Sequence, residues 1–384
     1  MKERSGYQPA PGELAAAESM LTPEQRAASE VREKFKQQER PAFFDSAEKF
    51  TDKMERKPPT PEQRRQIEAE LGKLGDLFAG SDVRWQLDGA INISLMAGDF
   101  IGAHKDVDIS IDQADLSKLD GILDKKGYGL FISRLKDEKQ PGGDRVMERR
   151  GASGLSGEPA EHVMLAAVDA QGKLRGGEEL DYVDVHVVRR DAAGKPVGPF
   201  GASLPERWYE PQKIEHNGRE LKISQPELVA YFKIREGRAY DLNDLRHLVE
   251  AGRLPKEKIE EVGSVIENDM NARRQMVDGM TGDVLAGLGE EQDPGKIVEA
   301  FAAHPRVAGR ITEKDDPQLS QLRDVLAGLG KIDRAQFTEA VVKVFRLTDY
   351  EDEQRQKIQK LLNWSREHED RERVARARED IEHL

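Results

Sequence analysis

The chain has 384 residues, enough for two or three domains of ordinary size, and a formal net charge of -13 at pH 7, which argues against a broad electrostatic surface for nucleic acid. It contains no cysteine, which excludes disulfides, thiolate nucleophiles and cysteine-ligated zinc. With 35% charged residues and a mean hydropathy of -0.72, part of the chain is expected to be solvated helix or disordered arm rather than packed core.

Residues 1–60 predict a polar arm that is partly disordered or helical, because Glu, Lys, Gln, Ala and Pro dominate the segment. It opens without a hydrophobic region of signal-peptide type, and no run approaches the roughly 20 apolar residues that cross a bilayer. We therefore expect a cytoplasmic protein with no membrane contact. In "KPPTPEQ" the arm ends: Thr60 is a helix N-cap candidate, with Pro61 at the first helical position and Gln63 in the capping-box position.

Residues 61–254 alternate between helical and extended patterns, and we interpret them as one domain. Its fold class is α/β (α+β), with a mixed β-sheet and flanking helices. The expected helices are "PEQRRQIEAELGKLGDLF", "AINISLMAG", "DLSKLDGILDKKG", "QPELVAYFKIREG" and "DLNDLRHLVEAG". The expected strands are "VRWQLD", "KDVDISID", "YGLFISRL", "RVMERR", "HVMLAAVD" and "LDYVDVHVVRR", followed by a hairpin around Asn217-Gly218.

Residues 255–384 predict a helical C-terminal domain, because the extended patterns stop after "RLPKEK". The heptapeptide "DVLAGLG" occurs at 283–289 and again at 324–330, which indicates a duplicated helical hairpin. Beyond Trp364 the sequence is almost entirely charged. This terminal helix is interpreted as a solvated helix with i,i+4 ion pairs, or alternatively as a helix that binds a protein partner.

The segment "KDVDISID" has strict period two, which places Asp106 and Asp108 on one face of a strand together with Ser110 and Asp112. Two carboxylates so close repel each other unless a cation lies between them, and Mg²⁺ with oxygen ligands fits that arrangement. The alternative is an amphipathic strand whose polar face is simply solvated. Asp112 lies about 13 Å from Asp108 at roughly 3.3 Å per residue, so it is expected to be structural.

Two further segments favour the metal site over the solvated strand face. "QLDGAINISLMAG" runs from an extended segment through Gly89 into a helix, whose first N–H groups suit phosphate. "ELDYVDVHVV" is another period-two strand that places Asp184 and His186 on the same face. If this strand lies beside the Asp-x-Asp strand, Asp184 becomes a third carboxylate, and the set suits metal-assisted nucleotidyl transfer. His186 is expected beside the site rather than on the metal, since Mg²⁺ prefers oxygen.

"WQLDGAINISLMAGDFIGAHKDVDISI" resembles the signature of the nucleotidyltransferase superfamily with the polymerase-beta-type fold: a Gly-Gly or Gly-Ser turn, a short helix, and a strand with Asp-x-Asp. It looks closest to the antibiotic nucleotidyltransferases acting on lincosamides and aminoglycosides, which have a His two residues before the Asp-x-Asp, as His104 is here. "VDVHVVRRDAAGKPVG" and "PELVAYFKIREGRAYDLNDLRHL" are similar to later segments of that group. In this chain the turn itself is Asp88-Gly89-Ala90.

The resemblance implies a nucleotidyltransferase core at 61–254 that transfers a nucleoside monophosphate from an NTP, for example ATP, to a hydroxyl and releases pyrophosphate. Its implied metal ligands and catalytic residues, at a two-Mg²⁺ site, are Asp106, Asp108 and Asp184, with His186 as a neighbour of the site. Its implied nucleotide-binding residues are Asp88, Gly89, Ala90, His104 and Lys233, the last as the cation for the triphosphate.

The acceptor implied by the resemblance is a small hydroxylated molecule such as an antibiotic. A second hypothesis is a toxin-type enzyme that modifies tRNA or protein, with the helical extension used for recognition; the acidic balance speaks against RNA. A third hypothesis is a catalytically decayed interaction module that binds a protein partner through its charged C-terminal helices.

Overall fold

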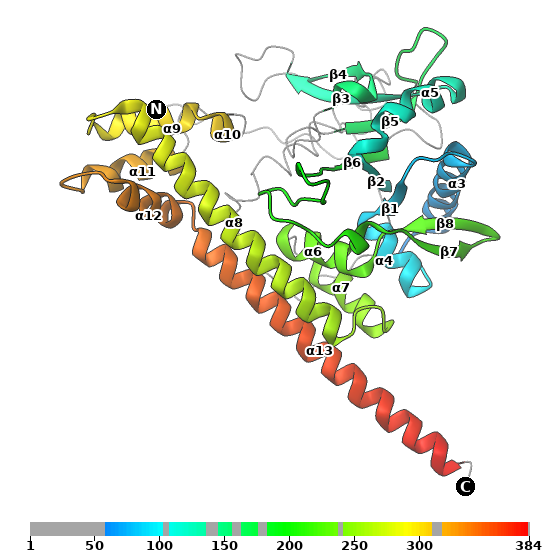
Figure 1. The fold of residues 1–384 in the computed structure, drawn as a ribbon. Coiled ribbons are helices and arrows are strands. Elements are labelled where there is room, and N and C mark those ends of the chain that lie inside the picture. The colour runs from blue at the N-terminus through cyan, green and yellow to red at the C-terminus, as the bar shows by residue number, and fades with distance from the viewer. Residues whose placement is uncertain are drawn as a thin grey trace, which may run out of the picture.

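The computed structural model describes residues 58–102, 107–135, 145–155, 163–175, 183–236, 241–308 and 317–382. A twisted sheet with helices packed around it forms one part of the molecule, and a long helical arm crosses beside it (Figure 1). The strands are β1 (Trp85–Asp88), β2 (Val107–Asp112), β3 (Tyr128–Leu135), β4 (Arg145–Arg150), β5 (Val163–Ala167), β6 (Val183–Val188), β7 (Gln212–His216) and β8 (Arg219–Ile223).

The described strands form one eight-stranded sheet in the order β4-β3-β5-β6-β2-β1-β8-β7. The β2·β6 and β1·β8 pairs are parallel and the other pairs are antiparallel. The predicted fold class, α/β (α+β) with a mixed sheet and a helical C-terminal part, is thereby confirmed. The hairpin turn forms at Asn217 and Gly218, whose φ angles are 50° and 73°.

The helices before the long arm are α3 (Pro61–Phe78), α4 (Gly89–Ala97), α5 (Leu116–Lys126), α6 (Pro226–Glu236) and α7 (Asp241–Glu250), with short 3₁₀ helices η1 (Gln113–Asp115), η2 (Ala152–Gly154) and η3 (Glu206–Tyr209). At the start of α3 the predicted capping box is present: Thr60 Oγ1 accepts from Gln63 N, and Gln63 Oε1 accepts from Thr60 N. Of the predicted arm, residues 1–57 lie outside the described residues.

The period-two pattern of β2 separates two environments. Val107, Ile109 and Ile111 are fully buried in the largest apolar cluster, which also takes side chains from α3, α4 and α5. The opposite face of the same strand carries the polar side chains. β2 therefore directs its aspartates to one face of the sheet and its apolar core residues to the other.

Helices dominate the chain after residue 255 (Figure 1). They are α8 (Lys256–Leu288), α9 (Pro294–Ala303), α10 (Pro305–Ala308), α11 (Pro317–Ala327), α12 (Arg334–Val344) and α13 (Leu347–Glu382). The first half of α8, up to Met270, packs into the same apolar cluster as the sheet, whereas its second half, from Val277, packs with α9 to α12 in a second cluster. None of the described helices combines the length and the apolar character needed to cross a membrane.

The connection from β6 to η3 reaches the long helices. The ring of Phe200 lies 5.1 Å from the Arg235 guanidinium carbon of α6 and 5.7 Å from that of Arg273 in α8. A side chain on the nearby Gly198 would collide with the hydroxyl of Tyr231. This connection is therefore tied to the helices at one end and to the strand carrying Asp184 at the other.

Candidate active site

Three aspartates form a row across the middle of the sheet. Asp88 of β1 is the register partner of Asp108 of β2, and Asp108 is the register partner of Asp184 of β6. Because register partners on neighbouring strands point to the same face, the three carboxylates are neighbours on the polar face. Asp88 and Asp184 are buried, at 4% and 6% exposure, and Asp108 is half-buried. The structure thus brings together acids that lie up to 96 positions apart.

Gly89 forms the turn between β1 and α4, and it is in direct contact with this row. Its φ is +67°, and a Cβ on it would lie 2.1 Å from Asp108 Oδ2. Any side chain would therefore both strain the backbone and displace the carboxylate. The helix α4 begins here with Asp88 as N-cap, whose Oδ1 accepts from Gly89 N at 2.9 Å. The turn presents the N-terminus of α4, with its partial positive charge, beside the row.

A second polar row lies one step further along the same strands. Gln86 of β1 pairs in register with Ser110 of β2, and Ser110 with His186 of β6. Ser110 Oγ donates to Asp88 Oδ2 at 2.5 Å, and His186 Nδ1 donates to the same oxygen at 3.3 Å. The buried amide of Gln86 has no hydrogen-bond partner for either atom within the described chain. Sequence reasoning placed Ser110 on this face but gave it no role.

The acids shift the pKa of the imidazole in their midst. The hydrogen bond to Asp88 and the charges of Asp108, Asp88 and Asp184 raise the pKa of His186 to about 10. Burial would raise the pKa of Asp88, yet the bonds from His186, Ser110 and the Gly89 backbone lower it. His186 therefore supplies a positive charge within a group of carboxylates.

Residues 70–139 match the family model described as aminoglycoside-2''-adenylyltransferase. The matched segment includes β1, the Gly89 turn, α4 and β2, and so two acids of the row. The chain contains a nucleotidyltransferase core. The match confirms the superfamily predicted from the sequence and the predicted enzyme class, a nucleotidyltransferase.

Solved structures that are similar to parts of this chain include the following two. One is the lincosamide antibiotic adenylyltransferase LnuA bound to lincomycin, with 18% identity and a TM-score of 0.29, covering 50% of this chain and 98% of that one. The other is an antigenic nucleotidyltransferase-like protein from Paracoccidioides brasiliensis, with 13% identity and a TM-score of 0.30, covering 57% of this chain and 93% of that one. No curated protein matches the chain. Both TM-scores are low, so the assignment of the nucleotidyltransferase core rests on the family match.

The structure describes two of the three metal ligands predicted for the nucleotidyltransferase core. Asp108 and Asp184 lie side by side, whereas Asp106 lies outside the described residues, as does His104. Within the described ranges, no group of three or more His, Asp or Glu side chains is arranged to hold a metal ion. The donor set nevertheless fits a hard cation, since two neighbouring carboxylates offer oxygen ligands alone.

Lys233, predicted to bind the triphosphate, lies in α6 and is 5% exposed. Its Nζ donates to Asp241 Oδ1 at 2.7 Å and to Asp244 Oδ2 at 2.6 Å, both at the start of α7. Two buried carboxylates thus surround this ammonium group and link α6 to α7. These two contacts hold Lys233 against the start of α7.

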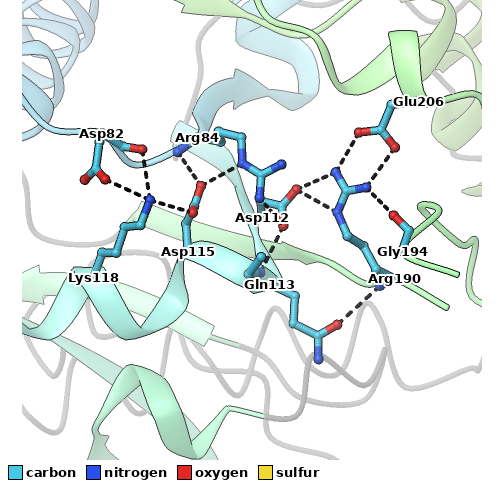
Figure 2. A network of polar contacts seen from close by, with 10 residues as sticks. Asp82, Arg84, Asp112, Gln113, Asp115, Lys118, Arg190, Gly194 and Glu206 are labelled. Atoms are coloured by element: carbon cyan, nitrogen blue, oxygen red, sulfur yellow. Dashed lines mark hydrogen bonds and ion pairs between the residues drawn. The ribbon is translucent and has the colours of Figure 1, made fainter. Parts of the chain in front are cut away.

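Asp112, expected from the sequence to be structural, lies at the far end of β2 in a separate network (Figure 2). Its Oδ2 accepts from Arg190 at 2.6 Å and its Oδ1 lies 3.1 Å from Arg84, while Arg190 also pairs with Glu206. Asp115 accepts from Arg84 and pairs with Lys118. These bonds tie the end of β2 to the segment that follows β6 and to η3, and leave Asp112 outside the aspartate row.

Proposed function

We propose that this chain transfers a nucleoside monophosphate from an NTP to a hydroxyl of a small-molecule acceptor, with release of pyrophosphate and dependence on Mg²⁺. The observation that carries the proposal is the row Asp88, Asp108 and Asp184 in contact with the Gly89 turn. The family match over 70–139 supports the same reaction class, and the adenylyltransferase description of that family makes ATP the first donor to test.

In this proposal Asp108 and Asp184 hold Mg²⁺, with Asp106 as a further ligand. When bound, the metal supplies charge neutralisation for the triphosphate and for the pyrophosphate leaving group. Every ligand offered is a carboxylate oxygen, the type that Mg²⁺ prefers. Because Asp184 is 6% exposed and faces its neighbour Asp108, its position is set by the sheet rather than by a mobile loop.

The turn at Asp88, Gly89 and Ala90 orients the triphosphate. Gly89 has no side chain, so a phosphate can approach the backbone, and the N–H groups at the start of α4 point toward anions. The positive charge of His186 lies on the same face. Lys233, whose ammonium group is held by Asp241 and Asp244 at the start of α7, stays the proposed cation for the triphosphate.

In the chemical step the acceptor hydroxyl oxygen attacks the α-phosphorus of the NTP. The bond from that phosphorus to the bridging oxygen of pyrophosphate breaks, and pyrophosphate leaves with the bond electrons. The hydroxyl proton passes to a carboxylate of the row, for which we propose Asp184. A small molecule is the proposed acceptor because the matched family is described by an aminoglycoside substrate.

The test is transfer of label from each α-³²P-labelled NTP, with Mg²⁺, to a panel of aminoglycosides and other hydroxylated small molecules. We expect labelled product and unlabelled pyrophosphate from the wild type, and a loss of at least about 100-fold in Asp108→Asn and Asp184→Asn. Asp112→Asn is the matched control, because it changes the same strand and face outside the row. It should lower stability but not the rate per folded molecule.

Other results would point elsewhere. Label that appears on tRNA or on protein would replace the small acceptor by a macromolecular one. Absence of label with every NTP, together with a melting temperature that Mg-NTP leaves unchanged, would contradict both enzyme hypotheses and favour a non-catalytic module.

A further inference from the structure

The carboxylate of Asp88 is occupied by the protein itself. Its Oδ1 accepts from Gly89 N, and its Oδ2 accepts from both Ser110 Oγ and His186 Nδ1. At 4% exposure, a carboxylate with these bonds has one fixed orientation. Asp88 is therefore built as a support within the site and has little capacity left for a ligand.

We propose that Ser110 and His186 are positioning residues that act through Asp88: the three form a clamp that fixes the Gly89 turn and, through it, the carboxylate of Asp108 for metal binding. We call Asp88, Ser110 and His186 the Asp88 clamp. The proposal rests on the proposed function, because it assigns the clamp to the same site.

Ser110 and His186 fix the position of the Asp88 carboxylate. Ser110 and His186 come from β2 and β6, and both reach back along the sheet from the second row to the first. The two donors on one oxygen link Asp88 of β1 to its neighbour β2 and to β6, the strand on the far side of β2. The clamp therefore ties together the three strands that carry the aspartate row.

Asp88 in turn acts on Asp108 through the Gly89 turn. The bond from Gly89 N to Asp88 Oδ1 fixes the first residue of α4. The α-carbon of Gly89 is so near Asp108 that a Cβ there would lie 2.1 Å from Oδ2. The position of the Gly89 turn therefore restricts the position of Asp108 Oδ2. A turn released from Asp88 would let that carboxylate take other rotamers.

Ser110 could stabilise the fold without positioning Asp88. A matched serine elsewhere in the chain distinguishes these two roles. Ser224 is also fully buried, and its Oγ donates at 2.8 Å to the backbone oxygen of Leu87, the residue before Asp88. Both serines thus stabilise the end of β1 by one buried hydroxyl bond. Of the two serines, only Ser110 contacts the Asp88 carboxylate.

The experiment compares full-length wild type with Ser110→Ala, Ser224→Ala and His186→Ala. Mn²⁺ affinity is measured from the electron paramagnetic resonance signal of the free ion, and melting temperature is recorded for each protein. The Mg²⁺ concentration for half-maximal labelling by ATP is the second functional readout. His186→Ala is a safe second variant, since its side chain is 56% exposed and not part of the core.

We expect Ser110→Ala and His186→Ala to weaken Mn²⁺ binding by about 10-fold or more, the size found for supports of metal ligands. The Mg²⁺ requirement should rise while the KM of the acceptor stays constant. Ser224→Ala should melt lower than wild type, as Ser110→Ala does, but bind Mn²⁺ like wild type.

If Ser110→Ala and Ser224→Ala bind Mn²⁺ equally, the clamp has no positioning role and the proposal is overturned, while the proposed function stands. A wild type that neither binds Mn²⁺ nor transfers label overturns the proposed function, and the clamp with it.

Discussion

Gly89 combines two constraints that are separable by experiment. Its positive φ disfavours any L-residue by about 1–2 kcal/mol, and the nearness of Asp108 excludes a Cβ. The first constraint is a property of the backbone alone. The second concerns the carboxylate that we assign to the metal, so it should affect activity beyond its effect on stability.

Gly89→Ala should therefore lose nucleotidyl transfer by at least about 100-fold, because the methyl group displaces Asp108 Oδ2. The matched control is Gly80→Ala, where φ is +71° but nothing lies within 4 Å of the added Cβ. Both variants should lose about 1–2 kcal/mol in urea denaturation. Only Gly89→Ala should lose labelling per folded molecule; equal activity of the two would contradict the predicted contact.

Ala90 stands where the resembling families have a second Gly or a Ser in the turn. A hydroxyl at this first turn of α4 could donate to a phosphate oxygen, and a hydrogen bond to a charged group contributes about 1.5–3 kcal/mol. We predict that Ala90→Ser lowers the KM for the NTP about 10-fold. Ala97→Ser, at the other end of α4, is the control and should leave the KM unchanged. An unaltered KM in Ala90→Ser would place the phosphate elsewhere.

At the scale of elements, the individual strands and helices follow from the sequence, because period two in "KDVDISID" and the Gly98 and Gly127 helix ends are local signals. The hydrogen bond between Asp88 and His186 does not follow from such local signals. It exists only because β1, β2 and β6 are consecutive strands in the sheet. Nothing local specifies that order. The sequence could suggest that Asp184 joins the acids, but it could not show that Asp88 is turned inward to Ser110.

The network around η1 predicts how stability responds to acid. Burial would raise the pKa of Asp115, but the bonds from Arg84 and Lys118 lower it below its ordinary value. The unfolded chain therefore binds a proton that the folded one does not, so this group stabilises the fold above about pH 4 and the stability is lost as pH falls.

Asp115→Asn should accordingly show a smaller fall in unfolding free energy between about pH 5 and about pH 3 than wild type, measured by urea denaturation at each pH. At pH 7 the variant should be the less stable of the two, because Arg84 and Lys118 lose their charged partner. Asp76→Asn, whose carboxylate is exposed, serves as control and should follow the wild-type curve. Parallel curves for Asp115→Asn and wild type would show that Asp115 does not contribute.

At the scale of the whole molecule, α8 connects two apolar clusters without interruption. The sequence predicted helices after residue 254, yet no local signal shows that one helix of 33 residues begins in the cluster of the sheet and ends in the cluster of α9 to α12. The two halves of α8 are buried against different neighbours, and tertiary packing rather than the local sequence decides which neighbours these are. Buried polar pairs such as Arg235 with Asp269 then fix α6 against α8.

The end of α13 contrasts with α8, since its C-terminal part extends away from the rest of the described chain (Figure 1). Almost every side chain from Arg366 to Arg378 is exposed, and Arg373 with Asp370 is an ion pair at i,i+3 rather than i,i+4. Exposed pairs of this kind contribute about 0–1 kcal/mol. This part of the helix therefore adds almost nothing to the packing of the molecule.

Deletion of residues 366–384 is thus expected to leave the melting temperature and the rate of nucleotidyl transfer at their wild-type values, measured by calorimetry and by labelling. A deletion that begins at Lys357 is the control: it also removes Leu361, which is fully buried in the cluster of the sheet, and should cost about 2–5 kcal/mol or more. If the shorter deletion lowers stability in a manner that depends on protein concentration, the helix end binds a second copy, because only a contact between chains makes unfolding concentration-dependent.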